Sequence, residues 1–197
     1  FINSISFYPL MKLFFVTGNR NKFDEVKKVT DRYGIELEWS DVDVVEQKLK
    51  TEKEVAIAKA LSSLKILNKP VLVEDTGIYF EAYRDFPGPN AKVVFNGVGI
   101  NGILKLLEGK PRKAKFVTAF AYATPNLHPV AFVGECEGNI AEKPSEVIDF
   151  AYDTIFVPKG ETRTFSEMTK EEKERYSHRA KALEEFIKWY KARKQGE

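Results

Sequence analysis

Residues 13–29 read LFFVTGNRNKFDEVKKV, and this stretch indicates the fold class. Its first four residues form a short apolar run, as expected of a strand. A polar segment, TGNRNK, comes next, after which Phe23, Val26 and Val29 recur at the spacing of one helix face. The stretch therefore predicts a strand, a turn and a helix in succession.

The chain repeats this alternation further on. In residues 35–39, IELEW, apolar and acidic side chains alternate as in a half-buried strand. Residues 51–54, TEKE, have the spacing of a capping box and precede apolar residues at helical spacing. A third apolar run, residues 71–73, leads directly into Glu74 and Asp75, which predicts a buried strand that ends in two carboxylates.

The second half of the chain carries a hairpin and a terminal helix. Residues 113–123 and 130–140 are long strand-like segments, and PNLHP at residues 125–129 is rich in turn formers. From Ala180 onward, apolar residues fall on one face of a helix whose other positions are mainly charged. Strands that alternate with helices, together with one long hairpin, predict an α/β fold with a mixed sheet.

Composition restricts the class of protein. The 197 residues suit one domain, which we place at residues 11–197, with residues 1–10 as an N-terminal extension outside the fold. Lys and Arg number 31 against 29 Asp and Glu, a balance that disfavours non-specific nucleic-acid binding. No apolar run of about 18 residues and no signal-peptide layout occur, which indicates a cytoplasmic protein without a membrane segment. The single cysteine, Cys136, is expected to be a small buried hydrophobe.

The turn at residues 17–22 has the features of a phosphate-binding loop. A turn from a strand into a helix presents free backbone N–H groups and the positive end of the helix dipole, and Lys22 adds a cation. The motif is neither a Walker loop nor a dinucleotide fingerprint, so an ordinary helix-start loop is the alternative.

Glu74 and Asp75 are candidates for metal binding and acid–base chemistry. Mg²⁺ prefers one or two carboxylates and leaves its other positions to water and phosphate oxygens. Asp75 can also accept a proton from an attacking water. The alternative for residues 75–77, DTG, is a plain turn. Glu46 is a candidate second acid, and its alternative is a solvated loop carboxylate.

Two further clusters suit a nucleoside. In residues 149–153, DFAYD, an aromatic ring can stack on a base and a carboxylate can accept hydrogen bonds, while a core position for the aromatic residues is the alternative. Lys173 and residues 177–179, SHR, precede the terminal helix, where Ser177 is a candidate N-cap. Histidine and arginine oppose the dipole in the first helical turn, which indicates a ligand role; a solvated helix start is the alternative.

Together these clusters resemble the inosine triphosphate pyrophosphatase family, over residues 11–191. The resemblance rests on the order and spacing of five motifs: TGN at 17–19 with Lys22, VEDTG at 73–77, FPGP at 86–89, DFAYD at 149–153 and SHR at 177–179. It implies an α/β fold with an elongated central mixed β-sheet flanked by helices, two lobes with the active-site cleft between them, and a homodimer. It also implies a Mg²⁺-dependent enzyme that hydrolyses ITP, dITP and XTP to the monophosphate and pyrophosphate.

By matching positions, the resemblance implies a role for each motif residue. Asp75 would activate water and, with Glu46, hold Mg²⁺. The substrate-binding residues fall into three groups: Thr17, Gly18, Asn19, Arg20, Asn21, Lys22, Lys59 and Thr76 at the phosphates; Phe150, Ala151, Tyr152 and Asp153 at the base and sugar; and Lys173, His178 and Arg179 at the purine.

The chain departs from the family pattern at two positions. Ala151 stands where the family has glycine, and Thr154 stands where it has proline. Glycine reaches φ values that alanine avoids, so the first exchange puts the backbone of this loop in question.

Two other functions are weighed against this one. The first is a related enzyme that hydrolyses modified or pyrimidine nucleoside triphosphates, and the SHR motif argues against it. The second is a catalytically silent nucleotide-binding or RNA-binding module. Balanced charge and the pair of Glu46 and Asp75 argue against this module, because a pure binder needs no metal-and-base site.

Overall fold

The computed structural model describes residues 12–44, 47–147 and 151–195, so residues 1–10, the predicted extension, lie outside the described residues. Its elements, in chain order, are β1 (Leu13–Val16), α1 (Arg20–Asp31), β2 (Leu37–Ser40), α2 (Glu52–Leu67), β3 (Val71–Phe80), β4 (Pro87–Gly88), α3 (Ala91–Leu106), β5 (Lys113–Thr124), β6 (Leu127–Ile140), the 3₁₀ helix η1 (Ala151–Thr154), β7 (Phe156–Pro158), the 3₁₀ helix η2 (Phe165–Glu167), α4 (Lys170–Tyr176) and α5 (His178–Gln195). The predicted strand–turn–helix start is confirmed.

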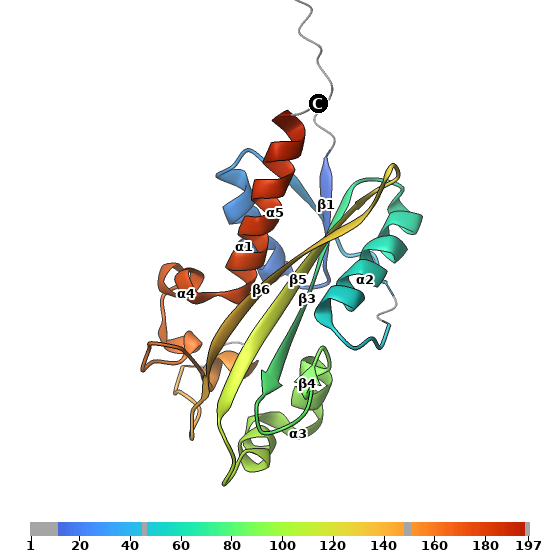
Figure 1. Ribbon diagram of the computed structural model, residues 1–197. Helices are drawn as coiled ribbons and strands as arrows, with labels where there is room; N and C mark the ends of the chain where they lie inside the picture. The colour runs from blue at the N-terminus through green and yellow to red at the C-terminus, as the bar shows by residue number, and fades with distance from the viewer. Residues whose placement is uncertain (1–11, 45–46, 148–150, 196–197) are drawn as a thin grey trace, which may run out of the picture.

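The strands form one mixed sheet. Its order is β2-β1-β3-β5-β6-β7, and β4 pairs with β3 at the side. β1 is parallel to β2 and β3, whereas β5 is antiparallel to β3, β6 to β5 and β7 to β6. The long strands β3, β5 and β6 run the length of an elongated molecule (Figure 1). This confirms the predicted α/β fold with a mixed sheet flanked by helices.

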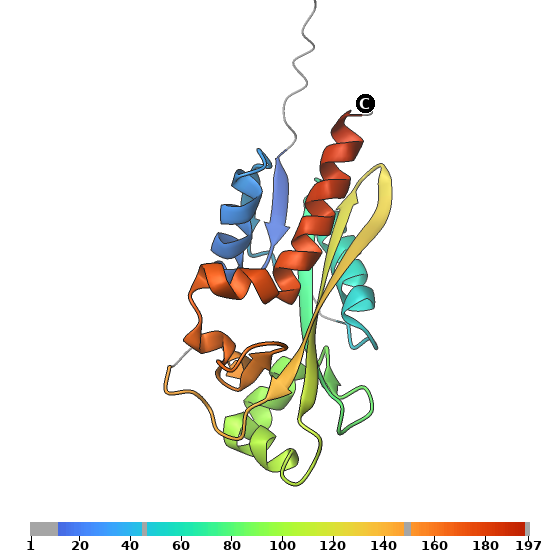
Figure 2. The same cartoon turned by 60° about the vertical axis from the view of Figure 1, so that its left-hand side comes forward.

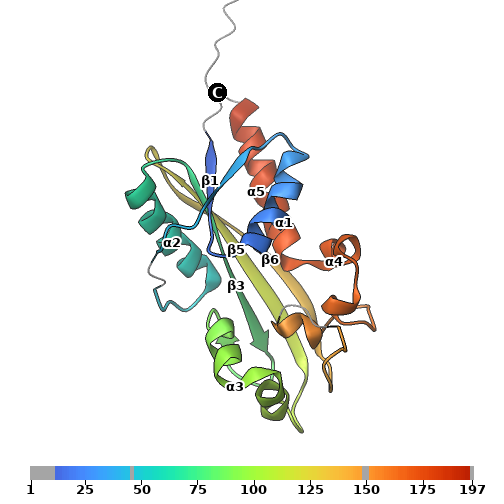
Figure 3. The same cartoon turned by 180° about the vertical axis from the view of Figure 1, so that it is seen from behind.

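Helices cover both faces of the sheet (Figure 2). α1 and α5 pack on one face, where Phe15 and Leu72 meet Phe186 of the predicted apolar side of α5. α2 covers the opposite face, where it packs on Val71 and Val73 (Figure 3). At the far end of the sheet, α3, η1 and η2 enclose a separate aromatic core. Because two cores meet along β3 and β5, polar side chains at their junction are held by packed elements on either side.

Local signals in the sequence account for the helix starts next to this junction. The Asn19 side chain accepts a hydrogen bond from Lys22 N and caps α1. Thr51 and Glu54 form the predicted reciprocal capping box at the start of α2. Ser177 accepts a hydrogen bond from the Ala180 N–H at 3.3 Å, which confirms it as the N-cap of α5.

The prediction that this strand ends at the two carboxylates, Glu74 and Asp75, is wrong. β3 continues to Phe80 and pairs with β5 along its whole length, from Val71 opposite Ala123 to Phe80 opposite Ala114. The hydrogen bonds of this ladder keep the polar residues 74–77 extended, so they form a strand and not a turn. Consecutive side chains of a strand point to opposite faces, and the two carboxylates are therefore separated by the sheet.

Smaller expectations have mixed outcomes. The hairpin turn is shorter than predicted, because β6 already begins at Leu127 and includes Pro129. Proline has no backbone N–H for the ladder, and the pairing of β5 with β6 shifts register by a bulge next to it.

Two other features of the chain were also predicted. Cys136 is buried, as predicted. Within the described part of the chain, no helix is long and apolar enough to cross a membrane.

Candidate active site

The candidate site lies where the middle of β3 lacks a neighbouring strand on one side. β1 pairs with β3 as far as Val16 opposite Val73, and β4 pairs with β3 at Tyr79 and Ile78. Within the described ranges, residues 74–77 pair with β5 alone. The turn at residues 17–22 leaves the carboxyl end of β1 beside this interruption, and ligands of α/β proteins bind at such strand ends. A ligand there can reach side chains from both faces of the sheet.

Two hydrogen bonds hold the turn, one to the end of β2 and one within the turn. The Thr17 N–H donates to the carbonyl of Ser40 at 2.9 Å, and the Asn19 N–H donates to Thr17 Oγ1 at 3.1 Å. Gly18 is exposed, and a Cβ there would meet no atom within 4 Å. The turn therefore leaves room beside its backbone for an anion at the start of α1.

The three basic and amide side chains that follow point to different surroundings. The Arg20 guanidinium lies over the rings of Phe23 and Trp39, 5.2 and 5.0 Å from their centroids, and pairs with Asp24. Asn21 is exposed. Lys22 is half-buried and points to β3. Of the three, Lys22 is the one that the structure brings to the centre of the site.

Glu74 is the meeting point of several positive and hydroxyl groups. Its side chain is 1% exposed. Lys22 Nζ donates to its Oε1 at 3.0 Å, and Arg179 donates from Nε to Oε2 at 2.8 Å and from Nη2 to Oε1 at 3.3 Å. Thr76 Oγ1 donates to the same Oε1 at 2.6 Å. Burial alone would raise the pKa of Glu74, but the charges of Arg179 and Lys22 outweigh burial and hold it well below the ordinary value.

Asp75 lies on the other face of β3, toward α2. It follows Val73 of the core under that helix, and Lys59 lies half-buried on the same helix. Gly77 is the next residue of this face, and a Cβ there would lie 1.9 Å from Glu52 Oε1 and 2.5 Å from the Gly88 carbonyl oxygen. Glycine is required at this position because α2 and β4 close on its backbone.

The carboxylate of Glu52 belongs to the surroundings of Asp75. It is 2% exposed and accepts a hydrogen bond from Tyr79 Oη at 2.9 Å. Burial raises the pKa of Glu52 above its ordinary value, and burial together with this hydrogen bond also raises the pKa of Tyr79. Burial therefore raises the pKa of the acid on this face, whereas the charges of Arg179 and Lys22 lower the pKa of Glu74 on the other face.

The predicted purine-recognition residues gather on the Glu74 face. His178 begins α5, is 3% exposed, and stacks on Phe116 with ring centroids 4.4 Å apart and an interplanar angle of 11°. Its Nδ1 is buried and makes no hydrogen bond within the described residues. Burial, and then the charge of Arg179, hold the pKa of His178 well below its ordinary value, so the ring is neutral. Lys173 forms an ion pair with buried Asp153 next to this cluster.

The DFAYD segment is only partly described, because residues 149 and 150 lie outside the described ranges, as does Glu46. Tyr152 is enclosed by Phe80, Phe95 and Phe116, and its hydroxyl donates to the carbonyl of Ala91 at 2.8 Å. Tyr152 therefore occupies the core position that the sequence analysis gave as the alternative to stacking on a base. Ala151 is the first residue of η1.

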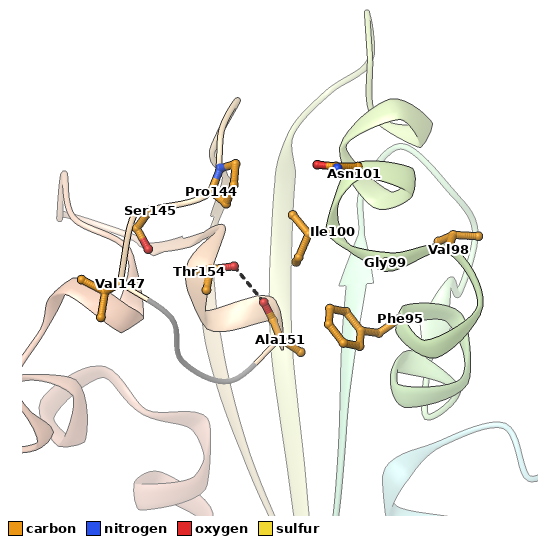
Figure 4. Close-up of a pocket in the computed structure, with 10 residues that line it drawn as sticks. All are labelled: Phe95, Val98, Gly99, Ile100, Asn101, Pro144, Ser145, Val147, Ala151 and Thr154. Carbon is orange, nitrogen blue, oxygen red and sulfur yellow. Dashed lines mark hydrogen bonds between the residues drawn. The ribbon is translucent and has the colours of Figure 1, made fainter.

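A pocket of about 400 Å³ adjoins this segment (Figure 4). Thr154 Oγ1 donates to the Ala151 carbonyl at 2.9 Å on its wall, and Phe95 and Ile100 of α3 face it from the other side. The lining is Phe95, Val98, Gly99, Ile100, Asn101, Pro144, Ser145, Val147, Ala151 and Thr154. Both positions at which the chain departs from the family pattern thus line one pocket, and none of its lining residues belongs to the ion cluster on Glu74.

Sequence reasoning missed three contributors to the site. Thr118 is fully buried and shares a hydrogen bond of 2.5 Å with Thr76; a threonine within the otherwise apolar run of residues 116–123 was the available signal. Glu25 pairs with Arg179 at 3.1 Å, and its position three residues after Lys22 on α1 places both on one helix face. Glu52 had no signal, because an acidic residue in a first helical turn is ordinarily explained by the helix dipole.

Comparison with known proteins identifies the family of this chain. The family model that matches is that of the Ham1 family, over residues 13–189. A dITP/XTP pyrophosphatase of Methanopyrus kandleri is 47% identical over 182 residues, 92% of this chain and 97% of the relative. An inosine triphosphate pyrophosphatase of Yarrowia lipolytica is 42% identical over 178 residues, 89% of this chain and 94% of the relative.

Solved structures show the same architecture. A HAM1 protein of Coxiella burnetii matches with a TM-score of 0.79 and 26% identity, over 92% of this chain and 99% of that chain. A nucleoside-triphosphatase, dITP/XTP pyrophosphatase, of Mycobacterium abscessus matches with a TM-score of 0.71 and 30% identity, over 89% and 97%. The fold and site define an α/β protein that gathers cations and carboxylates at an interruption of its sheet. The chain belongs to the Ham1 family.

Proposed function

We propose that this chain hydrolyses ITP, dITP and XTP to the nucleoside monophosphate and pyrophosphate. The observation that carries the proposal is the match over nearly the whole chain to the Methanopyrus kandleri relative, whose name states dITP and XTP. The name of the Yarrowia lipolytica relative states inosine triphosphate. The arrangement around β3 supports it, because residues from the turn, β3 and α5 converge on one place. Such an enzyme would remove unusual purine nucleoside triphosphates from the nucleotide pool.

The triphosphate would bind at the turn of residues 17–22. Backbone N–H groups at the start of α1 and the positive end of its dipole favour phosphate oxygens, and Lys22 supplies a nearby cation. Lys59 on α2 and Thr76 on β3 would contact the chain of phosphates from the sides. A purely electrostatic and positioning role suits this reaction, because phosphoryl transfer needs little covalent chemistry from the protein.

Asp75 would orient and deprotonate the attacking water. Its carboxylate would also hold Mg²⁺, with Glu46 as the second proposed protein ligand. Mg²⁺ takes few carboxylates and completes its shell with water and substrate oxygens, so two carboxylates would be sufficient protein ligands. When bound, the metal would neutralise charge on the phosphates.

Base selection would come from the cluster on the Glu74 face. Arg179 and Lys173 are donors, and the buried His178 Nδ1 is an acceptor or donor still available to a ligand or water. Donors directed at a 6-oxo group would leave a buried group unpaired opposite the 6-amino group of adenine, at a cost of roughly 1–3 kcal/mol per hydrogen bond. Residues 150–153 would hold the base and sugar from the opposite side.

The test is pyrophosphate release from inosine, deoxyinosine, xanthosine, guanosine and adenosine triphosphates, with Mg²⁺ and after its removal by EDTA. We expect release from the inosine and xanthosine nucleotides, loss of release with EDTA, and recovery when Mg²⁺ is added back. Equal rates on all purine nucleotides would contradict the proposed selectivity. Nucleotide binding without turnover would instead favour the silent nucleotide-binding module.

A further inference from the structure

Glu74 bonds two cations to which the proposed function gives different tasks. Lys22 belongs to the phosphate-binding turn, and Arg179 belongs to the purine-recognition cluster. The two residues lie 157 positions apart in the sequence and come from α1 and α5. Both donate to Oε1 of the same buried carboxylate, at 3.0 Å from Lys22 Nζ and 3.3 Å from Arg179 Nη2.

The surroundings of Glu74 fix its carboxylate in one orientation. Thr76 Oγ1 donates to Oε1 at 2.6 Å, and Thr118 bonds the Thr76 hydroxyl in turn at 2.5 Å. Arg179 Nε holds the second oxygen, Oε2, at 2.8 Å. A buried carboxylate with this many directed donors is a rigid anchor, because each unmade bond at such a site carries a desolvation cost.

The positions of its partners argue against Glu74 as a metal ligand. Glu74 projects from the face of β3 opposite to Asp75, and its oxygens are already bonded to Lys22, Arg179 and Thr76. A divalent cation that joined Glu74 would displace ammonium and guanidinium groups from it. The role left to this carboxylate is to place its two cations.

We infer that Glu74 is a positioning residue that acts through Lys22 and Arg179, and so couples triphosphate binding to purine selection. The inference rests on the proposed function. Phosphate oxygens that draw Lys22 away from Oε1 leave this oxygen to Arg179 Nη2 and Thr76. The guanidinium is then held more firmly in the orientation from which it reads the base.

Glu25 also pairs with Arg179, but it is less suited than Glu74 to link the phosphate-binding turn to the purine-recognition cluster. It pairs with the same arginine at 3.1 Å, but its side chain is 49% exposed and it lies on α1 itself. Its bond reaches the outer side of the guanidinium, through Nη1. Exposed ion pairs contribute little and tolerate exchange with water, whereas a buried carboxylate must keep its partners.

Steady-state kinetics of Glu74→Gln test the inference. We expect KM for ITP and XTP to rise about tenfold, the preference of kcat/KM for ITP over ATP to fall about tenfold, and kcat to change less, because Asp75 is untouched. Glu137→Gln on β6, which breaks an exposed ion pair between Glu137 and Lys159, is the matched control and should leave all three values unchanged. An unchanged KM and preference in folded Glu74→Gln would overturn the inference.

A second variant covers the case in which Glu74→Gln does not fold. Glu74→Asp keeps the charge but is one methylene shorter, so it cannot reach Lys22 and Arg179 together. We expect the same rise in KM and the same loss of preference. A folded Glu74→Asp enzyme with native KM and native preference would overturn the inference equally.

A double-mutant cycle on unfolding in urea measures the coupling independently of turnover. Either cation alone can neutralise Glu74, so Lys22→Met with Arg179→Met should lose more stability than the sum of the single changes. The excess should vanish in a Glu74→Gln background, and additive single changes in the native background would overturn the coupling. A native chain that releases no pyrophosphate from any nucleotide would refute the proposed function, while the cycle would still decide whether Glu74 joins the two cations.

Discussion

Glu74 and Asp75 are adjacent in the chain, yet the structure gives them opposite surroundings. Glu74 is enclosed on the α5 face by a guanidinium, an ammonium and a hydroxyl group. Asp75 lies on the α2 face, and α2 carries half-buried Lys59 and the buried acid Glu52, whose pKa is raised. We therefore propose different tasks for the two carboxylates: Glu74 as a fixed counter-ion, and Asp75 as a base and metal ligand.

The difference arises from one property of strands. A turn at residues 74–77 would have allowed both carboxylates to converge on one metal ion, whereas the strand directs them to opposite sides. The charges and the burial on each face then set the pKa of the carboxyl groups there. Predictions that separate the two faces therefore test the account.

The largest effect is expected on the Asp75 face. Asp75→Asn should lower kcat/KM for ITP by about 10³-fold, because an amide can neither accept the proton from water nor hold Mg²⁺ as a carboxylate does. Urea unfolding should show little change in stability. Native turnover in this variant would remove Asp75 from the chemistry.

Packing on the same face supplies the second test. Gly77→Ala places a Cβ against Glu52 Oε1 and the Gly88 carbonyl, so we expect it to lower the free energy of unfolding by about 1–3 kcal/mol. Gly97→Ala is the matched control, since a Cβ at this exposed helical position meets no atom within 4 Å. The control should be neutral or stabilising by about 0.5–1 kcal/mol. Equal stability of the two variants would show that the close approach at Gly77 is absent.

Changes of substrate preference should come from the Glu74 face. Arg179→Ala should narrow the preference for ITP over ATP by about tenfold, because a donor to the 6-oxo group is lost. Lys22→Ala should instead slow hydrolysis of every triphosphate by a similar factor, since phosphate charge is common to them all. Kinetics on four purine triphosphates, with folding checked by circular dichroism, separate the two residues. Uniform slowing by Arg179→Ala would remove it from base recognition.

The last of these effects depends on pH and concerns the neutral ring of His178. Its pKa in the folded chain lies well below the ordinary value of 6.5, so the unfolded chain takes up the proton first. The stability it contributes is fully present above about pH 6.5 and is lost, at up to about 1.4 kcal/mol per pH unit, as pH falls toward the folded pKa. His178→Gln should flatten the pH dependence of urea unfolding between pH 6.5 and 5. His128→Gln, at an exposed position of β6, is the control, and equal flattening by both variants would contradict the assignment to His178.

The sequence predicted elements and motifs better than directions of side chains. Apolar spacing and capping residues were sufficient for β1, α1, α2 and α5, because these signals are local. The strand through residues 74–77 was missed, since its extended form depends on pairing with β5, some forty residues further along the chain. The ion cluster on Glu74 was missed for the same reason: Lys22 and Arg179 meet only after the sheet and α5 have packed.

The identity of the products from ITP tests the central claim most directly. We predict that the native chain with Mg²⁺ forms inosine monophosphate and pyrophosphate in equal amounts, with no inosine diphosphate, and that Asp75→Asn forms neither at a comparable rate. Chromatography of the nucleotides together with an assay of pyrophosphate gives both quantities in one reaction. Release of inosine diphosphate and orthophosphate, or an unaltered rate in Asp75→Asn, would contradict the account.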